Sequence, residues 1–425
     1  MLTVYCDHIT IRLRYTLEVI FEEILSCPIT ISQDKKSLGK GPCLNYSNEL
    51  LEGVPYIKPH SLIFENGIRI LAEKIDNSGM LFPTESDLIE QDTLALVFFL
   101  VSRYEEYLDD DRDEFGRIKA TNSQLYQAGL LHTPLVDKKV IELYNSLRSR
   151  YPTLPPLKRQ FQVIPTFDID VAYAFKGRGW LRRTRSTFKD VLTFEWKRIK
   201  RRKLVLHEEL VDDFDTYSYQ QRICQQAGTR PRHFFLLGNY GKYDKNLSHK
   251  QPLLRTLIND ISTWSDIGIH PSMRSNDSIR ILRKEIKRLK KIASLPVQRS
   301  RQHFLYLELP NTYQNLIEIG ILEDYSMGYA DRTGFRAGIC SPYKWYDLEK
   351  EEMTDLYIFP TQVMDSTLRD YQKLSLEEAK QEMLKLRSTI EQVNGTMIIL
   401  WHNHSATRKG EWEGWRGVLE AGLFG

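Results

Sequence analysis

The chain has 425 residues, of which 41% are hydrophobic and 27% charged, which is the composition of a soluble globular protein. That length exceeds what a single hydrophobic core usually supports, so we expect two domains. The five cysteines are scattered and odd in number, which argues against a disulfide framework or a cysteine-rich zinc site. The N-terminus lacks the apolar run of a signal peptide, and the longest apolar run, residues 94–101, is too short to span a bilayer. We therefore expect a cytoplasmic protein.

Charge is unevenly distributed along the chain. Residues 1–150 contain 16 Lys and Arg against 23 Asp and Glu, a net charge of −7, whereas the remaining residues contain 43 against 33, a net charge of +10. Three prolines at positions 152, 155 and 156 break the chain where the charge changes. These features predict domains at residues 1–155 and 156–425, and the basic second half suits an anionic or nucleotide-linked partner.

The first domain reads as a smaller α+β unit. Apolar residues at helical spacing predict helices at residues 12–25, 87–107 and 138–151. Short segments between them contain Pro and Gly and predict small strands at residues 56–57 and 68–71.

After the prolines, strands alternate with helices, which favours a parallel α/β sheet or a barrel. The expected strands are residues 162–167, 232–237, 266–270, 297–301, 356–361 and 396–402. Residues 279–292 form an expected amphipathic helix with a basic outer face. Ser375 and Glu378 have the spacing of a capping box at the start of another helix.

The strand expected at residues 162–167 is followed by two carboxylates, Asp168 and Asp170. Residues i and i+2 of a strand point to the same side, so these two side chains should project together. Two like charges at the buried end of a strand require a cation or a proton between them. The pair therefore indicates a metal site or an acid/base pair.

Histidines close several of the other expected strands. His270 and His402 are the last residues of expected strands, His303 follows the strand expected at residues 297–301, and Arg301 lies two residues before His303. The C-terminal ends of parallel strands meet at one edge of a sheet or barrel, where functional groups gather. A single histidine at a strand end is commonly a core residue, but three of them beside a carboxylate pair favour a site.

Two histidines and one aspartate, with open positions for water, suit Zn²⁺ or another divalent ion. Such an ion lowers the pKa of bound water and polarises a carbonyl. The second carboxylate is then free to accept the proton of water, and a further histidine to protonate the leaving group. Together these groups are suited to hydrolysing an amide or an ester.

At these residues the chain resembles the polysaccharide deacetylase (NodB-type carbohydrate esterase) family. Thr166-Phe167-Asp168-Ile169-Asp170 is similar to the first family motif, Thr-Phe-Asp-Asp, with Ile169 inserted. His270 matches the metal-binding histidine that begins the second motif. Arg301-Gln302-His303-Phe304 matches the third motif, an Arg followed after two residues by an aromatic, and Leu400-Trp401-His402 matches the last. The resemblance covers about residues 160–405. It implies a distorted (β/α) barrel, and the N-terminal segment resembles the uncharacterised domain that precedes such barrels in some bacterial proteins.

The resemblance also implies roles. Asp168 would be the catalytic base, Asp170 and His270 metal ligands, Arg301 the residue that orients the base, and His402 the acid. The second metal histidine of the family lies four residues after the first, where this chain has Arg274, and a guanidinium does not ligate a cation. We expect His303 to replace it. Because Ile169 separates the two aspartates, the sequence leaves open which of them is the base.

Other candidates are less specific. Tyr325 and Tyr329 lie where the family has loops that line the substrate; they are candidates to stack on a sugar, with an ordinary core role as the alternative. Trp401 would line the acetyl pocket or pack in the core, and Asp365 is a candidate to orient His402. Residues 176–203 combine many Lys and Arg with aromatic residues. This composition indicates either an anion-binding site or a helical insertion with a solvated basic face, and we favour the insertion.

The sequence thus predicts a metal-dependent carbohydrate deacetylase that acts on an N-acetylated sugar or glycan precursor and holds a divalent metal, with Zn²⁺ the first expectation. The alternative is a glycan-binding or assembly protein that keeps the fold without the full ligand set. Nucleic acid is the least favoured partner, because the net charge of the whole chain is only +3.

Overall fold

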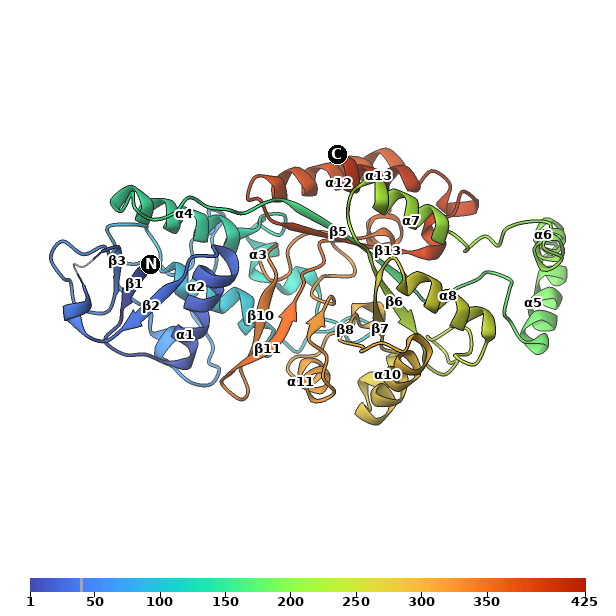
Figure 1. Cartoon of the computed structure of the whole chain (residues 1–425), viewed down its shortest axis with the longest axis horizontal. Coiled ribbons are helices and arrows are strands. Elements are labelled where there is room, and N and C mark those ends of the chain that lie inside the picture. Colours follow the sequence, from blue (N-terminus) through green and yellow to red (C-terminus); the bar gives the residue numbers. More distant parts are fainter. Residues whose placement is uncertain (39–40) are drawn as a thin grey trace. The chain divides into compact units, whose positions relative to one another are not determined.

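The computed structural model describes residues 1–38 and 41–425 (Figure 1). Its contacts group the chain into two compact units that alternate along the sequence. Unit 1 consists of residues 1–162, 305–363 and 385–398, and unit 2 consists of residues 163–304, 364–384 and 399–425. Each unit consists of three separate segments of the chain, so the grouping does not test a single domain boundary. The expected boundary at residue 155 stays a prediction.

Unit 1 contains a parallel four-stranded sheet in the order β2-β1-β3-β4. Its first elements are β1 (Leu2–Tyr5), α1 (Ile11–Leu17), β2 (Ile29–Ser32), β3 (Cys43–Tyr46), β4 (Tyr56–Ile57), α2 (Thr93–Val101), α3 (Gln124–Gln127) and α4 (Leu135–Arg150). Every residue of α2 is buried, which explains its continuous apolar sequence. The helix begins at Asp92, whose carboxylate accepts hydrogen bonds from the backbone N–H groups of Leu94 and Ala95.

The other segments of unit 1 form a second group of strands. An antiparallel hairpin of β10 and β11 is joined by β9, which runs parallel to β11. The elements of this group are α11 (Asn311–Glu318), β9 (Glu323–Asp324), β10 (Tyr343–Asp347) and β11 (Glu352–Ile358).

Unit 2 is built around neighbouring strands in the order β8-β7-β6-β5-β13-β12. β5, β6, β7 and β8 pair in parallel, with Asp168 opposite Phe234, Leu236 opposite His270 and Ile269 opposite Ser300. The strands are β5 (Gln162–Ile169), β6 (Arg232–Leu236), β7 (Asp266–His270), β8 (Arg299–Ser300), β12 (Val363–Met364) and β13 (Thr396–His402). The helices are α5 (Trp180–Leu192), α6 (Trp196–Leu206), α7 (Tyr217–Gln226), α8 (Pro252–Ser262), α9 (Met273–Asn276), α10 (Ile279–Ala293), α12 (Leu376–Glu391) and α13 (Arg416–Phe424). Four of these elements begin or end in unit 1, through Gln162 of β5, Val363 of β12, residues 385–391 of α12 and residues 396–398 of β13.

The expectation of an α/β fold with parallel strands is confirmed, but a closed barrel is not. Among the described residues β12 pairs on one side only, with β13, so the strand order has a free edge. A closed barrel has no such edge, because its first and last strands pair with each other. Unit 2 is therefore an open, mainly parallel arrangement of strands with helices, α7, α8 and α10 among them (Figure 1).

Several local predictions can be compared directly with the structure. The strands expected at 266–270 and 396–402 are β7 and β13, with the same bounds. The capping box is confirmed, because Glu378 accepts from the backbone N–H of Ser375 at 2.8 Å and Ser375 Oγ accepts from that of Glu378 at 3.4 Å. The strand expected at 68–71 is wrong, since those residues have no regular structure. All five cysteines are buried free thiols. No helix of residues 1–38 or 41–425 has the length and apolarity needed to span a membrane.

Candidate metal centre

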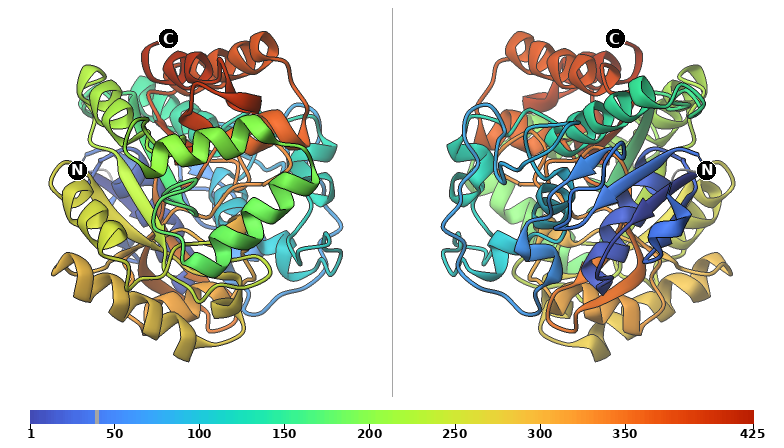
Figure 2. Two further views of the ribbon diagram at one scale, coloured as in Figure 1. Left: turned by 90° about the vertical axis from the view of Figure 1, so that its right-hand side faces the viewer. Right: turned by 90° about the vertical axis from the view of Figure 1, so that its left-hand side faces the viewer.

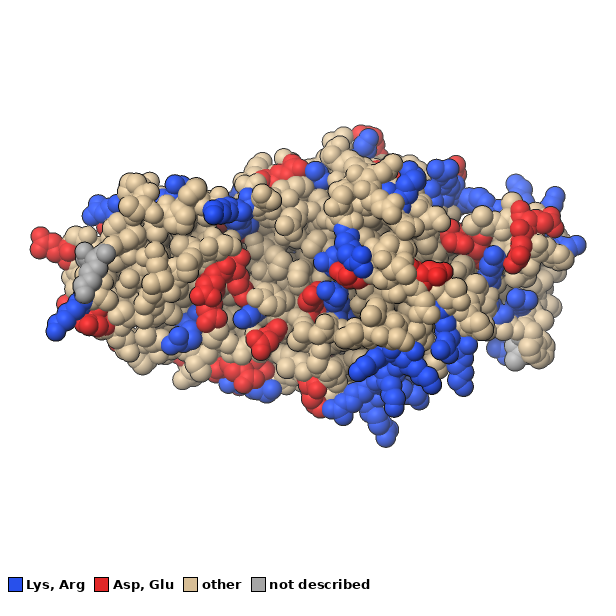
Figure 3. Space-filling view, viewed as in Figure 1, with Lys and Arg blue, Asp and Glu red and all other residues tan. Residues whose placement is uncertain are grey.

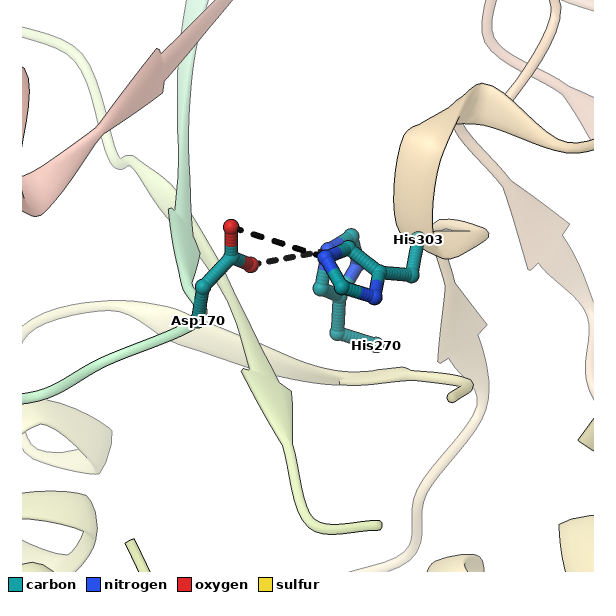
Figure 4. A group of neighbouring side chains, drawn as sticks. All are labelled: Asp170, His270 and His303. Atoms are coloured by element: carbon teal, nitrogen blue, oxygen red, sulfur yellow. Dashed lines mark ion pairs between the residues drawn. The ribbon is translucent and has the colours of Figure 1, made fainter. Parts of the chain in front are cut away.

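Three predicted ligands meet at the C-terminal ends of neighbouring strands in unit 2. Asp170 directly follows β5, His270 is the last residue of β7, and His303 follows β8. These strands run parallel through β6, so they end at the same edge. One ligand atom from each of Asp170, His270 and His303 lies within 4.8 Å of the others (Figure 4). The imidazole centroids of His270 and His303 are 5.0 Å apart.

The hydrogen bond of His270 fixes which of its nitrogens faces Asp170. Nδ1 lies 2.6 Å from the carbonyl oxygen of Arg301, and a carbonyl only accepts, so Nδ1 carries the hydrogen. In the neutral ring Nε2 then presents a lone pair to Asp170 Oδ1, 3.2 Å away. Both atoms are buried and neither has a hydrogen-bond partner among the described residues. Two buried acceptors facing each other are unfavourable until a proton or a cation lies between them, which is what a metal site requires.

A buried carboxylate orients His303 in the same way. Asp244, in the loop after β6, lies 3.1 Å from Nδ1 of His303, and it also accepts the backbone N–H of Met273 at 3.1 Å. Because Asp244 accepts, Nδ1 donates and Nε2 is directed to Asp170 Oδ2, 3.7 Å away. A histidine held by a carboxylate through its other nitrogen is the usual arrangement of a metal-binding imidazole.

The charges of this cluster depend on one another. Burial raises the pKa of Asp170, but His303, His270 and His402 outweigh it and hold that pKa well below its ordinary value. Burial lowers the pKa of His303, but Asp170 and Asp244 outweigh it and raise that pKa to about 9. Without a metal the cluster therefore holds a proton at neutral pH, in the place where a cation would stand.

The second carboxylate of the motif has a different partner. Asp168 is 2% exposed, and its Oδ1 accepts from Nη1 of Arg301 at 3.2 Å. The same nitrogen donates to Thr166 Oγ1 at 2.6 Å, and the guanidinium stacks on Phe234, 4.8 Å from the ring centroid. Arg301 is fully buried. Its fixed position keeps Asp168 beside the cluster, with Oδ2 lying 3.7 Å from Nε2 of His270.

His402, the last residue of β13, faces the cluster from the other side of Asp170. Its Nε2 lies 3.7 Å from Asp170 Oδ2. Asp365 is fully buried and contacts Nδ1 of His402 at 2.7 Å, while its other oxygen accepts the backbone N–H of His402 at 2.7 Å. Burial lowers the pKa of His402, but Asp365 and Asp170 outweigh it and raise that pKa to about 10.

The predicted sugar contacts have other surroundings. Trp401 is fully buried in β13, so its ring has no exposed face. In unit 1, Tyr325 is buried against Phe359 with ring centroids 4.7 Å apart. Tyr329, also in unit 1, is buried beside Arg336 and lines a hollow of about 420 Å³. These positions favour the core role for all three, and sugar stacking stays a prediction.

Sequence reasoning overlooked Asp244. It lies in the loop after β6, eight residues beyond Leu236, and neither a motif nor a strand-end position marks it in the sequence. Arg274, at the position of the second family histidine, is exposed on α9. His303, in contrast, lies in the cluster with Asp170 and His270.

Comparisons with known proteins match parts of the chain. A family model described as "Family of unknown function (DUF7033)" matches residues 2–152. The search of curated proteins found no match. Among solved structures, a putative polysaccharide deacetylase from Mycobacterium smegmatis is similar with a TM-score of 0.38 and 16% identity, over 64% of this chain and 86% of that one.

Two further structures are similar to a lesser degree. The Xyl-CE4 domain of a multidomain xylanase from the hindgut metagenome of Trinervitermes trinervoides has a TM-score of 0.28 and 12% identity, over 62% of this chain and 82% of that one. A 4-alpha-glucanotransferase from Thermococcus litoralis has a TM-score of 0.34 and 11% identity, over 61% and 36%. Likenesses of this extent decide neither the fold nor the reaction of this chain.

Proposed function

We propose that the chain is a metal-dependent hydrolase that removes acetyl groups from an N-acetylated sugar or glycan precursor. The observation that supports it most is that two buried acceptor atoms, Asp170 Oδ1 and His270 Nε2, face each other without a hydrogen-bond partner among the described residues. A ligand atom of His303 lies within 4.8 Å of ligand atoms of both residues. Two histidines and one carboxylate are typical of catalytic Zn²⁺ sites that keep positions open for water and substrate, so zinc is the first ion to test. The order of the motifs along the chain supports the same family of reactions.

The residues around the cluster suggest a division of roles. A bound divalent ion would polarise the acetyl carbonyl and lower the pKa of water. Asp168 contacts Arg301 and lies beside the cluster, so it is the candidate base for the attacking water. His402 is the candidate acid for the leaving amine, because Asp365 holds its ring and raises its pKa. Asp170, which faces all three histidines, is then left as the ligand.

Acetate release tests the proposal. The full chain, prepared with Zn²⁺ and without metal, is incubated with N-acetylated sugars and their oligomers, and acetate is measured. We expect release only from the zinc-loaded protein, with loss in the Asp168→Asn variant and unchanged zinc content in that variant. Release that is independent of metal would contradict the proposal. Stoichiometric zinc without release from any N-acetylated sugar would favour the glycan-binding alternative.

A further inference from the structure

Helices α5 and α6 form a hairpin with an unusual concentration of positive charge (Figures 1 and 2). Residues 176–203 contain 12 Lys and Arg against two acidic residues, Asp190 and Glu195. This excess of ten equals the net charge of the whole chain after residue 150. Such a concentration on one element attracts an anionic surface.

Buried contacts define the fold of the hairpin. Arg202 of α6 is buried, forms an ion pair with Asp190 of α5, and donates to Thr187 Oγ1 at 2.6 Å and Ser186 Oγ at 2.8 Å. Val205 of α6 packs with Ala174 and Phe175 in a small core. These contacts between α5 and α6 therefore fix which side chains lie on the outside of the hairpin.

Large apolar side chains on the hairpin face solvent. The exposed fractions are 71% for Trp180, 66% for Phe188, 62% for Leu192, 76% for Phe194 and 59% for Trp196. Single exposed apolar residues are ordinary, but these five lie within 17 residues of one helical hairpin, and exposed apolar residues gathered in this way mark interaction sites.

We propose that this hairpin docks on the surface of an anionic lipid bilayer. Helices that lie in a membrane interface combine Trp, Phe and Leu with Lys and Arg, so that the apolar side chains enter the acyl boundary while the cations contact the headgroups. Pairing of two copies through their hairpins is disfavoured, because it would bring like charges together. Aliphatic Leu192 also favours a lipid over nucleic acid, because single-stranded nucleic acid is held by aromatic stacking and cations.

Helix α10 shows what a merely solvated basic face looks like. It has seven Lys and Arg and forms a dense basic patch (Figure 3), but its apolar Leu282, Leu289 and Ile292 are buried. The hairpin differs in exposing its apolar side chains.

Vesicle flotation with the full chain tests the proposal, comparing vesicles of phosphatidylcholine alone with vesicles that also contain phosphatidylglycerol. We expect binding to the anionic vesicles that weakens with salt. The triple variant Arg183→Gln, Lys197→Gln, Lys200→Gln should bind about 100-fold more weakly, since each cation near an anionic surface contributes a factor of about five. The variant Phe188→Ser, Phe194→Ser, Trp196→Ser should lose at least about tenfold even at low salt, because its cations are unchanged.

Matched controls separate the hairpin from general charge. Lys284→Gln, Lys287→Gln, Lys291→Gln removes three exposed cations from α10, and Ile70→Ser removes an exposed apolar side chain of unit 1. Both controls should bind anionic vesicles as the wild type does, and circular dichroism establishes that all variants fold. Equal losses of vesicle binding in the α10 and hairpin variants would overturn the proposal. So would a wild-type protein that does not bind the vesicles but binds RNA or DNA oligonucleotides in retardation assays.

Discussion

Replacing His303 by alanine tests the metal centre most directly. The imidazole is one of three protein ligand groups within 4.8 Å of one another, and Asp244 directs its Nε2 towards Asp170. Zinc sites with four ligands bind with about 10–16 kcal/mol, which is about 3 kcal/mol per ligand. We therefore expect the variant to bind Zn²⁺ about 100-fold more weakly than the wild type.

The structure also predicts a graded response. Asp244→Asn keeps the shape of the side chain but removes the charge that orients His303, and the loss of such an outer partner weakens metal binding about 10–100-fold. His249→Ala removes a histidine of unit 2 that lies outside the cluster, and should leave the affinity unchanged. The order of affinities should be wild type and His249→Ala first, then Asp244→Asn, then His303→Ala.

Competition with a fluorescent zinc chelator measures these affinities, and elemental analysis after dialysis measures retained metal. Melting temperatures of the metal-free proteins show whether each variant folds. An affinity of His303→Ala within about threefold of the wild type, which is about 0.7 kcal/mol, would refute the assignment of His303 as a ligand.

Four further variants test buried ionisable groups of unit 2. His402→Ala should lower kcat for acetate release about 10²–10⁴-fold with zinc content unchanged, as measured by steady-state kinetics and elemental analysis. Asp365 raises the pKa of His402, so in Asp365→Asn the acid should lose its proton at lower pH and activity should decline at lower pH on the alkaline side, as measured by the pH profile of kcat. Arg301→Met should destabilise the protein by about 3–5 kcal/mol in urea unfolding, because it leaves Asp168 buried without its cation, and a loss below about 1 kcal/mol would contradict this. Burial lowers the pKa of His233 to about 3, so the unfolded chain binds more protons below pH 6.5 and stability falls as the pH falls. Between pH 6.5 and pH 5 the free energy of unfolding of the wild type should fall by about 2 kcal/mol more than that of His233→Gln. Urea titrations of both proteins at the two pH values measure this difference, and equal losses would contradict the prediction.

Local sequence patterns identified the elements that bear the site. The apolar runs before His270 and His402 predicted β7 and β13 with the bounds that the structure has. The rule that functional groups gather at the ends of parallel strands then singled out the segments with Asp170, His270, His303 and His402. The family resemblance suggested which of these residues are metal ligands. Both kinds of inference depend on neighbouring residues and on the regular geometry of strands, which a sequence specifies directly.

Other features depended on contacts between distant segments. Spacing alone left open which aspartate is the base, whereas in the structure Asp168 contacts Arg301 and Asp170 faces the histidines. Asp244 has no recognisable motif, and its role depends on the loop after β6 meeting the segment after β8. The expected strand at 68–71 was wrong because a short apolar run forms a strand only where a partner strand pairs with it.

The sequence by itself predicted the composition of the candidate site, which is two carboxylates, three histidines and one arginine at or after the ends of expected strands, in an α/β chain with parallel strands. Only the tertiary structure decided the partners of each group and the open edge at β12. The physical reason is that periodicity and residue chemistry are local properties of the chain. Hydrogen-bond partners, burial and pKa shifts exist only when strands far apart in the sequence lie side by side.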